Sequence, residues 1–279
     1  DVCSSDLGMG DFFERLQKAG RVYENNAPVY MRSHPMTTER LSDVQNRAQE
    51  APYRQVVDSL GFHLVRARLR AQAGTAREAV NDFETLRRER KFVSEAAVRY
   101  GLAYALLRTK DVAGAQGEMS SLLGLKKDSP MIAGLAADIR VAAGDLPGAL
   151  AILGDALQRF PTARSLVYGH VEALHAARQF DRARHFVETQ LQASPGDFKL
   201  HGLLAKTYAA LGKRLQQHRA LAEFYALQGQ LGPAVEQLQL AQRAGDGNFY
   251  EQSVVDARLR ELRQQQLEEM RQKNSGRNG

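Results

Sequence analysis

The chain has 279 residues, of which 43% are hydrophobic and 25% are charged, with a net charge of +6 and an isoelectric point of about 9.5. This composition is typical of a folded chain, and no run approaches the roughly 18 apolar residues of a membrane span. Charges of both signs are interspersed, and no basic stripe with interleaved aromatic residues is present, which argues against nucleic-acid binding. The single cysteine, Cys3, excludes an intramolecular disulfide.

The N-terminal segment carries two predicted helices. Residues 1–7, DVCSSDL, resemble the translation of a sequencing adapter, so we expect a non-native leader and a fragment whose native sequence begins near Gly8. Residues 11–24 place apolar side chains on one face of a helix, and a loop over 25–35 contains two prolines. Thr37 or Thr38 can cap a second helix, which ends at Ala51-Pro52.

Small residues recur every 34 positions through the rest of the chain. Ala115, Ala149 and Ala183 form one series, and twelve residues before each of them stands a second, continued at the same spacing: Ala103, Ala137, Val171 and Ala205. Two antiparallel helices approach closely only where small side chains meet, and this period is typical of the tetratricopeptide repeat, a stacked helix-turn-helix solenoid. The sequence therefore predicts an all-α fold, a tetratricopeptide-repeat helical solenoid over residues 53–245.

The repeat frame predicts helices in antiparallel pairs. They are expected over 60–73, 75–88, 93–108, 111–124, 130–143, 146–159, 163–178, 181–193, 197–211, 213–228 and 231–243. Gly74, Gly144 and Gly212 fall in the turns within pairs, where glycine adopts a left-handed backbone at little cost. A polar last helix over 251–272, with a thin apolar stripe that includes Met270, is expected to cap the array within a segment 246–272, and residues 273–279 are expected to be disordered. A coiled-coil arm is the alternative for this helix.

No complete catalytic motif is present in the chain. None of the seven histidines is followed by glutamate, so there is no His-Glu-x-x-His helix to hold zinc and activate its water. His170 and His175 are five residues apart, which turns them away from one another on a helix. Walker loops and Gly-x-Ser-x-Gly elbows are also absent from the sequence.

One segment is not explained by the repeat. Residues 8–47 contain Gly8-Met9, the helix Phe12-Phe13-Glu14-Arg15-Leu16, and Ser33-His34-Pro35 followed by Arg40. These pieces resemble the region downstream of the zinc site in HExxH metallopeptidases of the Ste24/Oma type. The order of the parts is similar to the bacterial periplasmic branch of that family, in which tetratricopeptide repeats follow the protease domain.

The resemblance implies that residues 8–50 end a metallopeptidase domain whose zinc ligands and catalytic glutamate are not in this chain, so the fragment alone should be inactive. It implies zinc in the intact protein and none in the fragment. In the periplasmic branch the matching histidine can reach the zinc, which makes His34 a possible regulatory ligand; the alternative is that His34 only packs its loop. Arg40 would point toward the same site or pair with a local carboxylate.

The first helix of each repeat is expected, by resemblance to tetratricopeptide arrays, to line a binding groove. The candidate groove residues are Arg68, Tyr100, Tyr104, Asp138, Tyr168, Glu172, His175 and Lys206. Tyrosines mixed with both charge signs favour a polypeptide ligand, although tyrosines can also simply fill gaps between repeats. The Lys and Asn residues of chaperone-tail clamps are absent, which disfavours a chaperone adaptor.

The family resemblance implies a periplasmic zinc metalloendopeptidase and chaperone-like factor for outer-membrane β-barrel protein assembly. Its partners would be outer-membrane protein clients and the β-barrel assembly machinery, with no nucleic acid and no transmembrane segment in this chain. A non-enzymatic repeat scaffold for protein–protein interaction is the alternative.

Overall fold

The computed structural model describes residues 14–15, 42, 46 and 57–275. Most of residues 8–50, including His34 and Arg40, therefore lies outside the described residues, as do 276–279. The chain divides into two compact units, Asp1–Asp58 and Ser59–Gly279, and the helices discussed below all belong to the second unit.

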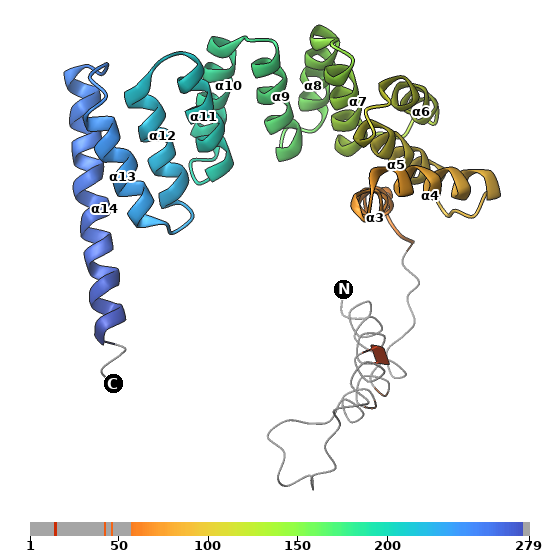
Figure 1. The fold of residues 1–279 in the computed structure, drawn as a ribbon, viewed down its shortest axis with the longest axis horizontal. Helices are drawn as coiled ribbons and strands as arrows, with labels where there is room; N and C mark the ends of the chain where they lie inside the picture. The colour runs from red at the N-terminus through yellow and green to blue at the C-terminus, as the bar shows by residue number, and fades with distance from the viewer. Residues whose placement is uncertain (1–13, 16–41, 43–45, 47–56, 276–279) are drawn as a thin grey trace, which may run out of the picture. The chain divides into compact units, whose positions relative to one another are not determined.

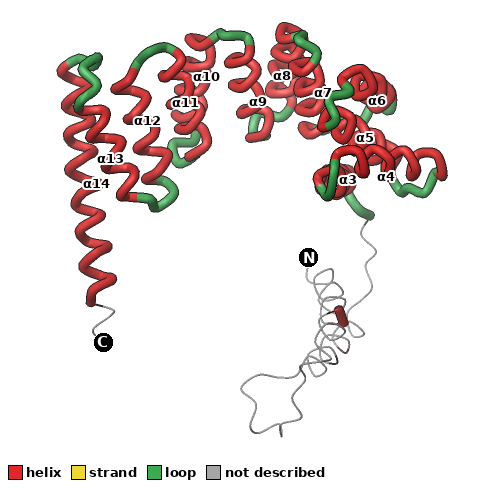
Figure 2. The backbone as a smooth tube through the Cα atoms, in the orientation of Figure 1, coloured by secondary structure: helices red, strands yellow, loops and turns green. Residues whose placement is uncertain are grey.

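Between residues 57 and 275 the structure consists of α-helices and connecting loops (Figures 1 and 2). The helices are α3 (Leu60–Gln72), α4 (Ala76–Glu89), α5 (Glu95–Arg108), α6 (Val112–Gly124), α7 (Pro130–Ala142), α8 (Leu146–Arg159), α9 (Arg164–Ala176), α10 (Phe180–Ala193), α11 (Phe198–Ala210), α12 (Arg214–Ala226), α13 (Leu231–Gln242) and α14 (Phe249–Ser275). These bounds agree with the predicted helices to within a few residues, and the fold is the predicted all-α tetratricopeptide-repeat solenoid. None of the described helices is long and apolar enough to cross a membrane.

The repeated small residues lie where paired helices cross. Ala115, Ala149 and Ala183 are completely buried, and the residues twelve positions before them are at most 2% exposed. A larger side chain at these sites would push the two helices apart. In each pair the first helix packs on the second, and the first helices also pack on one another in chain order from α3 to α11.

The turns within pairs share one backbone conformation. Lys110, Gly144, Arg178 and Gly212 stand 34 residues apart, and their φ angles are 65°, 79°, 54° and 71°. In each case the next residue donates its backbone N–H to a carbonyl five residues back, as Asp145 N does to Arg140 O at 2.9 Å. This is the Schellman pattern, which ends the first helix and reverses the chain.

The apolar core runs along the row of helices and has no single centre. Four clusters of buried side chains follow one another, from the first around α3–α7 to the last around α12–α14. Such a quasi-linear core is expected of a solenoid, in which each repeat buries its surface only against its neighbours.

The last helix closes the row by packing on α13 and α12. Val255, Leu259 and Leu262 of the predicted apolar stripe are buried, whereas Met270 is 48% exposed and lines a hollow with the start of α13. Because α13 has 12 residues and α14 has 27, the C-terminal end of α14 extends beyond α13. The helix also extends to Ser275, three residues into the predicted disordered tail.

Candidate polypeptide-binding face

One position of every first helix carries a polar or aromatic side chain. It directly follows the small residue of the repeat, and its occupants, which we call the first-helix face, are Arg68, Tyr104, Asp138, Glu172 and Lys206. Because the first helices pack on one another in order, these side chains follow one another along the same side of the array. Their contacts divide them into an N-terminal and a C-terminal group.

The N-terminal group joins α3, α5 and α7. The Arg68 guanidinium lies 5.1 Å from the centre of the Tyr104 ring, and the Tyr104 hydroxyl accepts a hydrogen bond from Gln72 Nε2 at 2.9 Å. Desolvation by neighbouring protein atoms raises the pKa of Asp138, and Arg68 partly offsets this. A guanidinium, a ring and a carboxylate thus stand within reach of one ligand.

Tyr100 lies beneath this group and not on its surface. Its side chain is completely buried, so it belongs to the packed core under the candidate groove. Burial raises the pKa of the Tyr100 phenol, and the adjacent Arg68 acts in the opposite direction. The Tyr100 hydroxyl nevertheless has no partner with hydrogen-bond geometry.

The C-terminal group joins α9 and α11. Lys206 Nζ and Glu172 Oε2 are 2.8 Å apart, although more than half of each side chain is exposed, so this ion pair contributes little stability. His175 Nε2 lies 2.7 Å from Thr207 Oγ1, whose own proton is donated to Leu203 O. The Thr207 oxygen must therefore accept, which places a proton on Nε2 of His175.

The environment of His175 disfavours its charged form. Burial and the Lys206 ammonium lower the pKa of His175, and Glu172 opposes this shift. His175 is therefore a neutral hydrogen-bond donor at neutral pH.

Tyr168 is half-buried beside the C-terminal group and is held from α11. Its hydroxyl donates to Asp197 Oδ2 at 2.8 Å, and Lys199 Nζ lies 5.5 Å from its ring centre. Burial and the bond to Asp197 raise the pKa of Tyr168 to about 12. The same Asp197 carboxylate accepts from backbone N–H groups at the start of α11, so it fixes both the tyrosine and the helix.

The sequence alone does not predict the partners that hold these side chains. These partners are Gln72, Asp197 and Thr207, and each lies 29 to 32 residues from the candidate that it contacts. The 34-residue period carries this information, since residues about one repeat apart on consecutive first helices face each other.

The described residues provide no zinc site. No group of three or more His, Cys, Asp or Glu side chains able to hold a metal occurs among them. His34 and Arg40, the two residues assigned to the neighbourhood of a zinc site, fall in the part of the chain that the structure does not describe.

Comparison with known proteins agrees with the fold and with the predicted resemblance. A tetratricopeptide-repeat family model matches residues 140–207. The chain is 27% identical over 265 residues to a protein of Escherichia coli (strain K12) named beta-barrel assembly-enhancing protease, covering 92% of this chain and 53% of that protein. A Yersinia pestis protein of the same name is 27% identical over 256 residues. The chain is similar to beta-barrel assembly-enhancing proteases over nearly all of its length.

These relatives are about twice as long as the chain, which spans about half of their length. Among solved structures, YrrB, titled a tetratricopeptide-repeat protein with an unusual peptide-binding site, is 14% identical with a TM-score of 0.45, covering 71% of this chain and 97% of that one. A MamA structure is 19% identical with a TM-score of 0.45, covering 61% and 96%. The repeat fold and the matched family support a role in protein–protein interaction.

Proposed function

We propose that this chain is the client-binding part of a periplasmic metalloendopeptidase with chaperone-like activity, which acts on outer-membrane β-barrel proteins at their assembly machinery. The observation that carries the proposal is the first-helix face, where cationic, anionic and aromatic side chains follow one another along a row of stacked helices. The similarity to beta-barrel assembly-enhancing proteases over 92% of the chain supports the kind of client.

The first-helix face suits an extended or unfolded polypeptide. Tyr104 offers a half-buried ring for apolar client side chains, and Arg68 next to it offers donors for client carbonyls and carboxylates. Glu172 and Lys206 compensate one another, and because both are solvent-exposed they can exchange partners with a client at small cost. Such a surface holds many sequences weakly, as a client-handling protein must.

Proteolysis would be a property of the intact protein. In this proposal residues 8–50 end the metallopeptidase domain, His34 is a regulatory ligand of its zinc, and Arg40 lies close to that site. No zinc-binding cluster occurs among the described residues, so we assign them binding and derive no catalytic step from them.

The test is a binding measurement with the full 279-residue chain. An outer-membrane β-barrel protein, unfolded in urea and diluted into buffer, is titrated by fluorescence anisotropy against the wild type, Tyr104→Ala and Arg68→Ala. We expect each substitution to weaken binding about three- to tenfold, since truncated aromatic and arginine anchors cost roughly 1 kcal/mol or more. Arg77→Ala, on the second helix α4, is the matched control and should bind like the wild type.

An unfolded protein of similar size that forms no β-barrel serves as the competitor. If it binds as tightly as the barrel protein while the face variants still lose affinity, the chain is a general repeat scaffold, and its barrel specificity is refuted. If the face variants bind both proteins like the wild type, the first-helix face is not the binding surface.

A further inference from the structure

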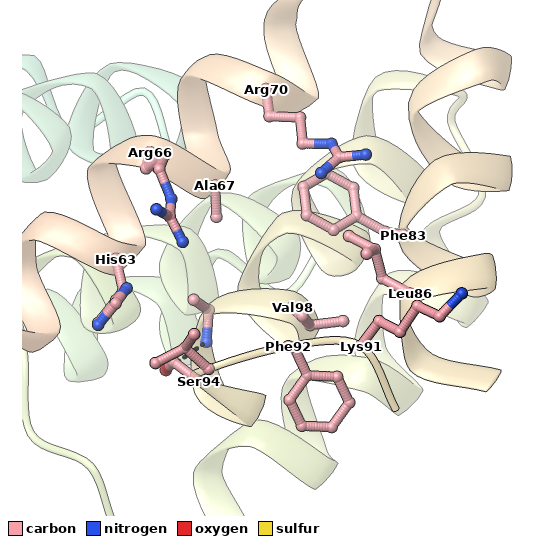
Figure 3. A pocket seen from close by; sticks show the side chains of 12 residues that line it. His63, Arg66, Ala67, Arg70, Phe83, Leu86, Lys91, Phe92, Ser94 and Val98 are labelled. Atoms are coloured by element: carbon pink, nitrogen blue, oxygen red, sulfur yellow. Dashed lines mark hydrogen bonds between the residues drawn. The ribbon is translucent and has the colours of Figure 1, made fainter. Parts of the chain in front are cut away.

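A second site lies at the start of the repeat array, away from the first-helix face. A cavity of about 380 Å³ opens between α3, the end of α4 and the beginning of α5. Figure 3 shows its two sides, with the His63 ring and the Arg66 guanidinium on one and Phe83 and Leu86 on the other. Val98 and Phe92 complete an apolar floor, and Arg70 and Lys91 add cationic groups to the rim.

The first repeat differs from the second and fifth at one position that lines this cavity. Arg66 stands immediately before the small residue Ala67, and in the second and fifth repeats this position holds Leu102 and Leu204, which are 1% and 7% exposed. Leu102 is packed into the core, whereas Leu204 lines a hollow of its own in the fifth repeat. Arg66 is exposed, so the hollow of the first repeat combines an apolar lining with a cation at its edge.

The electrostatics of the rim favour an anion. Arg70 pairs with Asp82 and Lys91 with Glu89, but no carboxylate of the described residues lies within salt-bridge distance of Arg66, whose guanidinium sits 5.4 Å from the Phe62 ring centre. Ser94, which also lines the cavity, is the N-cap of α5. The N-terminus of this 14-residue helix adds partial positive charge at the same place.

A buried polar atom lacks a partner in the same cavity. His63 is only 8% exposed, and its Nδ1 is buried without a hydrogen-bond partner. A buried group of this kind costs free energy unless a ligand or water satisfies it. It therefore points to a ligand with a polar group next to an apolar one.

We propose that this cavity binds the C-terminal residue of a polypeptide whose last side chain is apolar. The side chain would lie on Phe83, Leu86 and Val98, the terminal carboxylate would pair with Arg66 near the start of α5, and His63 Nδ1 would hydrogen-bond to the terminal residue. A free phosphate would leave the apolar floor uncovered, and an internal peptide segment without Asp or Glu would leave Arg66 without an anion. The inference rests on the proposed role in polypeptide binding and names a chemical feature of the client.

The probe is a fluorescent hexapeptide ending in phenylalanine, compared with the same peptide as its C-terminal amide and with one ending in serine. With the full wild-type chain we expect the free acid to bind about tenfold more tightly than the amide. A hydrogen bond to a charged group increases the binding affinity by about ten- to a hundredfold. The serine peptide should bind about tenfold more weakly because it leaves the floor exposed.

The variants assign this preference to the cavity. In Arg66→Ala the acid and the amide should bind equally, and His63→Met should weaken the acid severalfold, whereas Arg77→Ala should change nothing. Circular dichroism melts establish that each variant is folded, and the exposure of Arg66 makes its replacement structurally mild. Equal binding of acid and amide by the wild type, or a preference that survives in Arg66→Ala, would overturn the proposal.

Two further arms test the nature of the ligand and the independence of the cavity from the first-helix face. Phenylpropionate binding as tightly as the peptide would replace the polypeptide by a small carboxylate and so refute the proposed occupant. If the wild type does not bind the short acid while Tyr104→Ala loses binding of the unfolded client, the cavity proposal is rejected and the proposed function stands.

Discussion

At the residue scale, two turns of the array carry a strained backbone. Lys110 and Arg178 occupy the left-handed position that Gly144 and Gly212 occupy in the neighbouring repeats. An L-residue with a side chain pays roughly 1–2 kcal/mol for this conformation, and glycine avoids most of that cost. The glycines predicted their turns from the sequence, whereas a lysine or an arginine at the same position gives no local signal of a positive φ.

Lys110→Gly should therefore stabilise the protein, by about 0.5–1 kcal/mol after the larger entropy loss of glycine. The reverse change at the equivalent position, Gly144→Lys, should destabilise it by a similar amount, because an added Cβ at Gly144 has open space and only the backbone is strained. Urea unfolding of both variants gives the two free energies of unfolding. Shifts of the same sign in the two variants would contradict a cost that resides in the left-handed backbone.

A second residue-scale feature is the neutral state of His175. Because the folded-state pKa lies below the unfolded value, the folded protein binds this proton less readily than the unfolded chain does. Above about pH 6.5, the ordinary pKa of histidine, the titration of His175 does not lower the free energy of unfolding. As the pH falls below that value, the free energy of unfolding decreases. His170, whose pKa is lowered by burial and by Arg182, acts in the same direction.

His175→Gln should lose less stability than the wild type between about pH 6.5 and pH 5, since glutamine can donate to Thr207 and does not titrate. The change of stability with pH should become smaller in this variant but should not disappear, because His170 remains. Urea midpoints measured at closely spaced pH values provide the comparison. Parallel curves for the two proteins would show that His175 does not titrate as described.

At the element scale, side chains from other helices and loops cap the start of α12 and anchor α14 to its neighbour. Lys213, the N-cap residue of α12, supplies no side-chain hydrogen bond, and instead Asp246 accepts the backbone N–H groups of Arg214 and Leu215 at 2.5 and 3.0 Å. Although burial acts to raise it, the pKa of Asp246 is lowered by these bonds. A local sequence pattern does not reveal a cap that lies 31 or 32 residues away.

Arg258 anchors α14 to α12. It donates to both carboxylate oxygens of Glu223 at 2.8 and 2.7 Å, with each side chain about one quarter exposed, and these bonds raise the pKa of Arg258. Arg258→Ala should cost about 1–2 kcal/mol and should raise hydrogen exchange mainly in α14. Arg260→Ala, on the exposed side of the same helix, is the control and should leave exchange unchanged. Uniform exchange changes along the whole array in Arg258→Ala would argue against a local anchor.

At the scale of the whole described unit, the repeat period predicted most of the fold and part of the candidate site. Helix positions, crossing alanines and glycine turns all follow from a 34-residue spacing, because each depends on contacts within one repeat or between neighbours. The burial of Tyr100 and the hollow beside Arg66 do not follow from it. Both depend on how the side chains of particular neighbouring helices pack together, and the repeat period does not determine that packing.

The array is proposed to hold an unfolded barrel polypeptide on its first-helix face. The most direct measurement is site-specific photo-crosslinking, with a photoreactive amino acid placed at Glu172 on α9 or at Arg77 on α4 and an unfolded outer-membrane β-barrel protein as the client. We predict crosslinks from the Glu172 position and none from the Arg77 position. Crosslinks from the Arg77 position alone, or from neither position, would contradict binding on this face.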